Sequence, residues 1–493
     1  MLQAGETNLI ANVPEALRGD SAGIGRTSSY DCRGGAGSEL GNLTWTLHNV
    51  WMQARHGGDD ALLRDSLVPL LKRAAAYMVH QLKPGDDGRL HFPVDTSPEY
   101  PDKAPDTNYN LALLRWALEA LVAADERFAL KDPKAAEWRA TLEKLAPYPV
   151  DPKTGYMIGA GVPLAVSHRH FSHLLMVYPL GLVDAESAAD RPLIETSLDH
   201  WIHFEGALQG YSFTGAGAMS AWLGRRDTAV SLMNQFLDRF VKPNTMYLEA
   251  GPVIETPLAG AATIHELLLQ SWCPEPFGTH IRVFPSVPDA WADVSFRDLL
   301  AAGGFEVSAA RRGGATRWIR IRSLAGNPCR VQTGFPGEAA ASGARAFAVA
   351  TAPDRNGRRV TTVDLRKGET VLLTPAGAAP AAADLVLAPV APEPDRVNWF
   401  GSAKPVVVRP GPAGALCLMA TNAILHGPGL LREFKSKAGN IGHWTDPSDA
   451  VGWRISVPGP GVWTMRATHA GGGGVPLRLS VRRAGDEIGR AHV

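Results

Sequence analysis

The sequence predicts a multidomain α + β protein in which a helical toroid precedes antiparallel β-sandwich domains. Three observations carry this prediction. The 493 residues are enough for about three domains. Apolar residues recur with a helical period from about residue 43 to 290 and alternate in strand fashion beyond it. The 51 glycines and 37 prolines supply the turns of a loop-rich chain.

Composition excludes several classes of protein. Lys and Arg total 49, as do Asp and Glu, so the chain has no basic footprint for nucleic acid or for an anionic membrane. It has no run of about 18 uninterrupted apolar residues, so we expect no membrane span. The four cysteines lie far apart without a C-x-x-C pair, which argues against zinc or thioredoxin-like sites.

The two ends of the chain are weakly patterned. Residues 1–40 are polar and glycine-rich, and we expect a loop or extension there. The first residues lack the charged and apolar regions of a secretory signal. The last residues stop without a clean terminal element, so we expect a truncated reading frame.

Region 41–290 is expected to form the helical domain. Apolar residues between Leu62 and Leu82 follow a period close to 3.6 residues. Many helices joined by loops with Pro, Gly and Asp suit an α/α toroid better than a four-helix bundle. A toroid gathers its loops at one face, where a groove can form. The expected helices lie near 45–55, 62–82, 108–124, 134–146, 170–180, 190–203, 214–224, 227–241 and 257–271.

Strand patterns follow from about residue 290. Alternating segments such as Phe305–Ala309 and Thr316–Ile321 predict an antiparallel β-sheet domain over 291–375. The Ala- and Pro-rich stretch 376–395 is expected to be a linker. Short strands then predict a β-sandwich over 396–493, either carbohydrate-binding or purely structural, and truncated at its end.

The first candidate functional side chain is Glu99, in a loop between two helical runs. Pro98 fixes its own φ and pushes Ser97 out of the helical region, so this carboxylate is held on a stiff loop. We expect the neighbouring Tyr100 to desolvate Glu99 and raise its pKa, which suits a general acid. The alternative is a solvated loop glutamate without a role.

The second candidate is the run from Ser167 to His173, which holds three histidines and an arginine. His170 and His173 are spaced to share one helix face, and His168 lies at the expected helix entry. Imidazoles can contact sugar hydroxyls, and buried structural histidines are an equal alternative. A metal site is less favoured, because the pattern lacks H-x-x-x-H with a downstream carboxylate, and we expect no cofactor.

The third candidate segment holds Glu249 and Glu255, six residues apart in a proline-broken loop. A helix is expected to begin near Pro257 with Thr256 as its cap, so Glu255 would lie beside a helix N-terminus that favours its ionised form. An ionised carboxylate opposite a protonated one is what acid/base glycoside hydrolysis requires. Alternatively, Glu255 only supports the helix start.

Aromatic residues of the helical region offer stacking surfaces for sugar rings, although most are expected in the core. Tyr211 belongs to a loop-like run, 211–217, expected just before a helix, and is the better groove candidate. Trp45 and Asn49 lie near the start of the helical domain and are further substrate-binding candidates.

Four motifs in this order resemble the catalytic toroid of family 95 glycoside hydrolases, the α-L-fucosidase and α-L-galactosidase group. They are Thr96–Glu99, His168–Leu174, Ile254-Glu255 followed by Ile264–Ser271, and Phe284–Trp291. The resemblance covers roughly residues 40–310. It implies an (α/α)6 barrel followed by a β domain, and a periplasmic or extracellular location. The family's usual β-sandwich before the barrel has no counterpart in this sequence.

The resemblance also implies an inverting mechanism. Glu99 matches the general acid, and Glu255 falls where the family has an aspartate that helps to activate water. The family's asparagine pair near the start of the barrel does not align cleanly here, so Asn49 or Glu249 are alternatives for holding the water. Inversion requires the two carboxyl groups to lie roughly 6.5–9.5 Å apart.

We therefore expect an α-L-fucosidase-like glycoside hydrolase that cleaves a poly- or oligosaccharide. Two alternatives stay open: a polysaccharide lyase on a uronate polymer, using the histidine run and Arg169, and a non-catalytic glycan-binding protein. A toroid lacking some helices would expose apolar surface and favour an oligomer. The expected catalytic residues are Glu99 and Glu255, and the expected substrate-binding residues are His168, Arg169, His170, His173, Tyr211, Glu249, Asn49 and Trp45.

Overall fold

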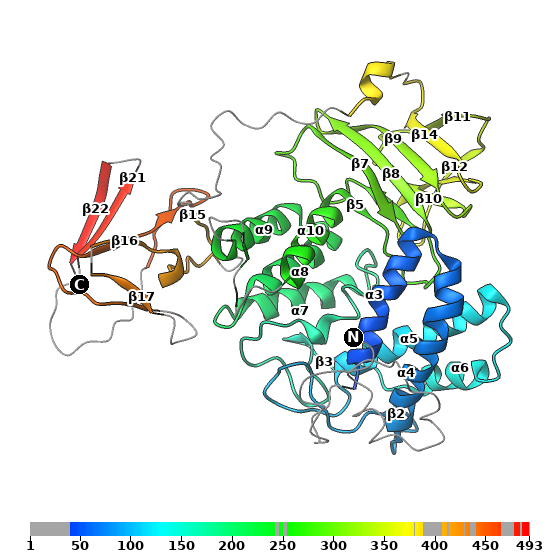
Figure 1. Ribbon diagram of the computed structural model, residues 1–493, viewed down its shortest axis with the longest axis horizontal. Coiled ribbons are helices and arrows are strands. Elements are labelled where there is room, and N and C mark those ends of the chain that lie inside the picture. The colour runs from blue at the N-terminus through cyan, green and yellow to red at the C-terminus, as the bar shows by residue number, and fades with distance from the viewer. Residues whose placement is uncertain are drawn as a thin grey trace. The chain divides into compact units, whose positions relative to one another are not determined.

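Along the chain, a helical region is followed by β-sheets (Figure 1). The chain divides into two units, Met1–Ile455 and Ser456–Val493, and the helices and the two large sheets belong to the first. The computed structural model describes residues 40–241, 246–247, 249, 254–378, 380–387, 407–411, 414–427, 429–433, 440–464, 478–483 and 486–492.

Eight of the nine expected helical runs are confirmed. No described helix is both long and apolar enough to cross a bilayer. Short two-stranded hairpins interrupt the helical region: β1 (Lys83–Pro84) pairs with β2 (Leu90–His91), and β3 (Val150–Asp151) with β4 (Gly155–Tyr156). The helices are α3 (Asn42–Gly57), the π-helix η3 (Leu62–Leu67) continuing into α4 (Val68–Gln81), α5 (Asn108–Phe128), α6 (Ala135–Lys144), α7 (Arg191–His203), α8 (Gly210–Trp222), α9 (Arg226–Phe240) and α10 (Glu255–Leu268).

The expected helix over 170–180 is wrong. Only a single 3-10 turn, η4 (Ser172–Leu174), forms there, and turns follow it. Pro179 has no N–H to donate and pushes the residue before it away from helical conformation. Gly181 then reverses the chain at a φ of 62°. His170 therefore does not share a helix face with His173.

Helices α5 and α8 form the interior of the helical region. Thr107 caps α5, because its hydroxyl accepts the Asn110 N–H at 3.3 Å. Almost every residue of α8 is buried, so it is enclosed by its neighbours rather than amphipathic. Gly215 in α8 lets the ring of Phe171 approach the helix, since a Cβ at this position would collide with that ring. The expected loop over 211–217 is therefore wrong, because these residues lie within α8.

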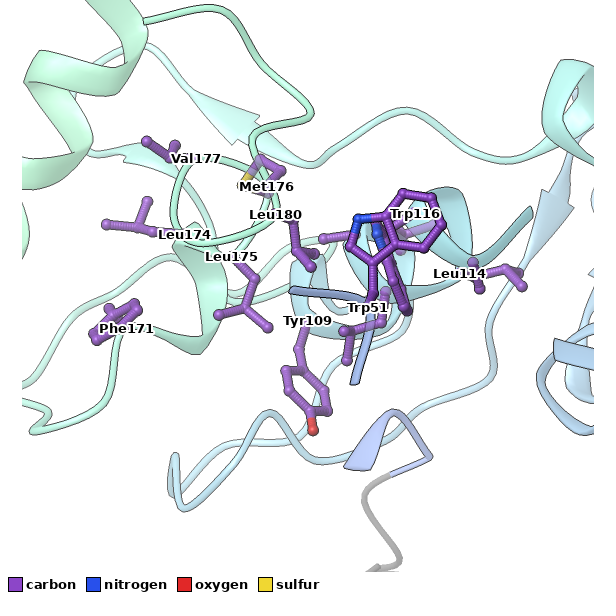
Figure 2. Packing of buried hydrophobic residues seen from close by; sticks show 14 of the residues in the cluster. Trp51, Tyr109, Leu114, Trp116, Phe171, Leu174, Leu175, Met176, Val177 and Leu180 are labelled. Carbon is purple, nitrogen blue, oxygen red and sulfur yellow. The ribbon is translucent and has the colours of Figure 1, made fainter. Parts of the chain in front are cut away.

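The core of the helical region is continuous and aromatic-rich. Figure 2 shows Trp51 and Trp116 next to one another, and their ring centroids lie 6.1 Å apart in an edge-to-face arrangement. Leu174 to Val177 are almost fully buried in the same core. Each fully buried side chain of this size contributes roughly 1.5–3 kcal/mol. The segment after His173 is thus anchored by packing, and its backbone hydrogen bonds form successive turns, not a continuous helix.

Two five-stranded sheets share one core in the β domain. One has the order β12-β13-β10-β6-β5, with one parallel pair, β6 with β10, and the other is antiparallel with the order β11-β14-β9-β8-β7. Side chains such as Val307 and its partner Ile321 are buried between the sheets. The strands begin earlier than expected, at Leu269. They are β5 (Leu269–Gln270), β6 (Ile281–Val283), β7 (Val294–Ala301), β8 (Phe305–Arg312), β9 (Ala315–Ser323), β10 (Cys329–Gln332), β11 (Ala339–Gly343), β12 (Val349–Pro353), β13 (Arg359–Val363) and β14 (Thr370–Pro375).

The described strands after residue 396 pair only two by two, so the expected β-sandwich over 396–493 stays a prediction. The 3-10 turn η5 (Ala382–Leu385) lies within the expected linker, and residues 388–395 of that linker lie outside the described residues, as do residues 1–39. In the second unit, β21 (Arg478–Arg483) and β22 (Asp486–His492) form a hairpin. The first unit holds β15 (Val407–Val408) with β20 (Arg454–Ile455), β16 (Ile424–His426) with β19 (Ala450–Gly452), and β17 (Leu431–Glu433) with β18 (Asn440–Gly442).

Candidate active site

Glu99 lies in a closed loop between β2 and α5. Asp95 and Ala104 exchange backbone hydrogen bonds of 2.9 and 3.0 Å, which join the two ends of this loop. The Asp95 carboxylate also accepts a 2.7 Å hydrogen bond from Asn110 of α5. Glu99 has a φ of 57°, a left-handed conformation that is uncommon for residues other than glycine. The loop presents its side chain to solvent, with 51% of it exposed.

The segment carrying the histidines is held against this loop. Trp201 of α7 donates its indole N–H to the His168 carbonyl at 2.8 Å, and Ser212 of α8 donates to the Arg169 carbonyl at 2.6 Å. His168 Nε2 donates to the Pro98 carbonyl at 2.9 Å. Burial, aided by His170, lowers the pKa of His168 to about 4, so this ring is neutral near pH 7. His168 thus joins the two loops beside Glu99 as a hydrogen-bond donor.

Arg169 and His170 both contact Glu99. Arg169 donates to Glu99 Oε2 from Nε at 2.9 Å and from Nη2 at 2.6 Å. His170 Nε2 lies 3.0 Å from the same oxygen. Partial burial raises the pKa of Glu99, but His170 and Arg169 outweigh it and leave that pKa below its usual range. Glu99 is therefore ionised near neutral pH while these contacts hold.

The expectation that Tyr100 raises the pKa of Glu99 is wrong. Tyr100 is buried, and its ring packs edge-on against His168 with a centroid distance of 5.3 Å. Its hydroxyl accepts the Ala165 N–H at 2.9 Å. Tyr100 therefore braces the histidine segment, and the immediate partners of Glu99 are cationic or polar.

A second carboxylate lies on the other side of Arg169. Glu249 Oε1 is 3.7 Å from Arg169 Nη1, and only 9% of the Glu249 side chain is exposed. The Tyr247 hydroxyl donates to Glu249 Oε2. Burial and this hydrogen bond both raise the pKa of Tyr247, which keeps the phenol protonated as a donor. One guanidinium thus lies between Glu99 and Glu249.

Glu255 is the first residue of α10 and is exposed. The helix begins two residues before Pro257, so Pro257 lies in its first turn as expected. The capping role of Thr256 is wrong, because Ile254 occupies the cap position and Thr256 is buried in the first turn. Burial and, to a smaller extent, the charge of Glu255 raise the pKa of Tyr211 to about 12. Tyr211 stacks on Phe171 at 5.2 Å, and its ring lies 6.0 Å from that of His170. Tyr211 therefore lies beside His170, which contacts Glu99.

Three expected site residues do not join this cluster. His173 is almost fully buried, and burial lowers its pKa to about 3. Trp45 is half-buried beside Tyr109, with a ring distance of 6.2 Å. Asn49 is exposed on α3. Among the described residues, no hydrogen bond or ion pair connects these three to Glu99, Arg169 or Glu249.

Sequence reasoning missed Tyr247, the donor to Glu249. It also missed Phe171, on which Tyr211 stacks. The available signal for Tyr247 was its position two residues before a candidate carboxylate in the same loop.

Two further features lie apart from this cluster. The ligand atoms of Glu186, His280 and Asp354 lie within 4.8 Å of one another, in principle a metal-binding arrangement. Arg282 already donates to Glu186 at 2.8 Å, however, and Gln332 donates to His280 Nε2 at 2.9 Å. An open groove of about 790 Å³ on the β domain shares no residue with the Glu99 cluster; its lining includes Trp318, Arg320, Phe347, Lys367 and Leu372.

Comparison with known families defines the class of this protein. Residues 24–268 match the glycosyl hydrolase family 95 catalytic domain, and residues 278–373 match the glycoside hydrolase family 95 C-terminal domain. The helical region with the Glu99 cluster and the β domain after it are thus those of a glycoside hydrolase. Within that class, the chain belongs to family 95.

Individual relatives are distant. Alpha-L-fucosidase 2 of Arabidopsis thaliana is 23% identical over 290 residues, which are 54% of this chain and 33% of that protein, so the chain spans about a third of its relative. A candidate kojibiose phosphorylase from the human microbiome has a TM-score of 0.40 at 9% identity, covering 59% of this chain and 44% of that one. A GH78 family rhamnosidase of Bacillus sp. GL1 has a TM-score of 0.36 at 14% identity, covering 57% and 31%. Neither structural likeness is close enough to carry an argument.

Proposed function

We propose that this protein is an inverting glycoside hydrolase with an α-L-fucosidase-like reaction on a poly- or oligosaccharide. Its helical region would be an (α/α)6-type toroid. The observation that carries the proposal is the position of Glu99, which projects from a closed loop onto Arg169 and His170 within the matched catalytic domain. An exposed carboxylate among sugar-binding side chains suits the proton donor of such an enzyme.

In the proposed reaction, the protonated Glu99 gives its proton to the glycosidic oxygen while the bond from this oxygen to the anomeric carbon breaks. Glu255 removes a proton from a water molecule, whose oxygen bonds to the anomeric carbon from the opposite face. His168, Arg169, His170 and Tyr211 would orient the sugar. The product therefore carries the opposite anomeric configuration to the substrate.

The resting site holds Glu99 in its ionised form, which is the wrong form for an acid catalyst. A bound sugar would remedy this in two ways: it excludes water from the partly exposed carboxylate, and its hydroxyls compete for the Arg169 donors. Both effects favour the protonated carboxyl. We therefore expect Glu99 to take up its proton as substrate binds.

The contacts of Arg169 argue against the lyase alternative. A lyase needs a free cation for the uronate carboxylate, and Arg169 is already engaged by Glu99 and Glu249. Its neighbour His168 donates to a backbone carbonyl and is not free to act as a base through Nε2.

Proton NMR of the reaction mixture tests the proposal. Aryl glycosides and oligosaccharides with α-L-fucosyl or α-L-galactosyl ends are incubated with the enzyme, and the first sugar released is observed before it mutarotates. We expect the inverted anomer. The retained anomer would contradict the mechanism, and an unsaturated uronate product would contradict hydrolysis. Binding without turnover across these substrates and a wider glycan panel would indicate a glycan-binding protein.

A further inference from the structure

The Arg169 guanidinium is shared by two carboxylates that reach it from different segments. Glu99 occupies the edge formed by Nε and Nη2, at 2.9 and 2.6 Å. Glu249 faces the remaining nitrogen, Nη1, at 3.7 Å. The contact to Glu99 has hydrogen-bond geometry, and the contact to Glu249 is longer. In this state Arg169 is therefore bound mainly to Glu99.

The surroundings of the two carboxylates differ. Glu99 is half exposed, and within the described part of the chain its direct charged or titratable contacts are Arg169 and His170, while His168 also senses its charge. Glu249 is enclosed, and its carboxylate accepts a hydrogen bond from the Tyr247 hydroxyl. The charges of both carboxylates act to raise the pKa of His170, against the burial that lowers it. The Glu249 side chain is thus held in place, whereas the exposed Glu99 has room to leave Arg169.

We propose that Glu249 is a positioning residue that holds the positive charge of Arg169 when Glu99 releases it to bind a proton. This role rests on the proposed function, in which Glu99 delivers that proton. Without Glu249, Arg169 would have Glu99 as its one carboxylate partner among the residues that the structure describes, and would remain on it. With Glu249, the guanidinium can turn about its own side chain toward a charge that is already in place.

The physical basis is the charge that Glu99 experiences. Opposite charges within about 4–6 Å favour the ionised form of a carboxyl group, by one to three pKa units in strong cases. Glu249 neutralises part of the Arg169 charge and itself adds a negative charge near Glu99. Removing Glu249 should therefore make Glu99 harder to protonate.

Titration of Glu99 in the folded protein tests this role without any substrate. Infrared difference spectra of protein labelled with 13C-glutamate report carboxyl protonation, and the band missing in Glu99→Gln identifies Glu99. We expect Glu249→Gln to lower the Glu99 midpoint by about 0.5–1 pH unit. Glu249→Asp keeps the charge but moves it farther from Arg169, because the side chain is one methylene shorter. It should lower the Glu99 midpoint by a smaller amount. If Glu249→Gln does not fold, this second variant alone decides the question.

Kinetics supply the second readout. The basic limb of the pH profile of kcat/KM should move down by the same amount in Glu249→Gln, with a three- to tenfold loss at pH 7 for substrates with poor leaving groups. Glu143→Gln removes an exposed carboxylate from α6 and should move neither the titration nor the limb. A uniform loss of rate with an unmoved limb and titration would overturn the role of Glu249. A wild-type enzyme that hydrolyses no glycoside would overturn the proposed function instead.

Discussion

Two charged clusters of this protein use the same kinds of side chain in different ways. Around Glu99, the carboxylate and Arg169 are 51% and 36% exposed. At the junction between the helical region and the β domain, Arg282 is only 4% exposed and donates to Glu186 at 2.8 Å. The junction is therefore expected to support stability, and the exposed cluster to be free for substrate.

The junction cluster also joins the helical region to the β domain. Asp184 accepts hydrogen bonds of 2.9 Å from both Arg355 and Asn356 of the β domain. Arg282 lies over the ring of Trp272, with its guanidinium carbon 3.8 Å from the ring centroid. Burial lowers the pKa of His280 to about 4, so this histidine carries no charge there near pH 7. The burial of Arg282 and Glu186 leaves these two groups little freedom to rearrange, which is the opposite of what a proton donor needs.

The largest expected effect is on stability at the junction. Arg282→Ala leaves the Glu186 carboxylate buried without its main partner, and such a loss costs about 3–5 kcal/mol. Denaturant unfolding measures this loss. The matched variant is Arg358→Ala, whose guanidinium is 52% exposed and 3.8 Å from the same carboxylate. We expect less than about 1 kcal/mol for this variant. Equal losses of stability in the two variants would show that burial does not determine how much each contact with Glu186 contributes.

At the exposed cluster we expect the opposite: a large loss of activity with a small loss of stability. Arg169→Met keeps much of the side-chain volume but removes the donors that would orient the sugar, and we expect about a hundredfold loss of kcat/KM even though Glu99 becomes easier to protonate. Its cost in unfolding free energy should stay below about 1 kcal/mol, because exposed ion pairs stabilise little. A large loss of stability with unchanged kinetics would mean that Arg169 is structural.

A buried carboxyl beside the junction makes stability depend on pH. Burial raises the pKa of Glu266 to about 7, although Trp222 donates to it at 2.8 Å. Its folded pKa thus lies above the unfolded value near 4.5, so the neutral form favours folding. This contribution is complete below about pH 4.5 and is lost as the pH rises through 7, for a total of about 3 kcal/mol.

Glu266→Gln removes this dependence while keeping an oxygen for the Trp222 donor. We expect the variant to match the wild type in stability at pH 5 and to exceed it at pH 8, as measured by thermal unfolding in buffers of equal ionic strength. Wild-type and variant curves that stay parallel from pH 5 to pH 8 would show that Glu266 does not titrate in this range.

Helices with a clear apolar period could be predicted from the sequence, and eight of them were. The run over 170–180 was equally apolar, but its residues are buried on all sides, as Leu174 to Val177 show. A uniformly buried segment carries no helical period, so only Pro179 and Gly181 hinted that the chain turns there. At helix α8 the error is the opposite one: the sequence predicts a loop over 211–217 where the structure has a helix. The glycines of α8 allow close packing and do not mark a loop.

The candidate site was predictable where it depends on local motifs. Glu99 and the pair Arg169–His170 stand out by residue type, and the structure brings them together. Their partners were not predictable, since they depend on where distant segments meet: Arg169 contacts Glu249 across 80 positions of the sequence. The burial of His173, three residues beyond His170, likewise follows from packing alone.

The smallest expected effect concerns the scaffold below Glu99. Thr107→Ala removes the hydroxyl that caps α5, and loss of such a cap costs about 1 kcal/mol. Thr107→Ser keeps the oxygen and should recover most of this stability. Denaturant unfolding of the three proteins checks the order. A serine variant as unstable as the alanine variant would assign the loss to the methyl group of Thr107.

The most direct test of Glu99 as the proton donor is the leaving-group dependence of Glu99→Gln. A nitrophenolate departs without a proton, whereas the alcohol of a natural glycan needs one. We expect kcat/KM to fall by about 10²–10⁴ on an oligosaccharide and by far less on the nitrophenyl glycoside of the same sugar. Equal losses on both substrates, or no loss on either, would contradict the assignment of Glu99.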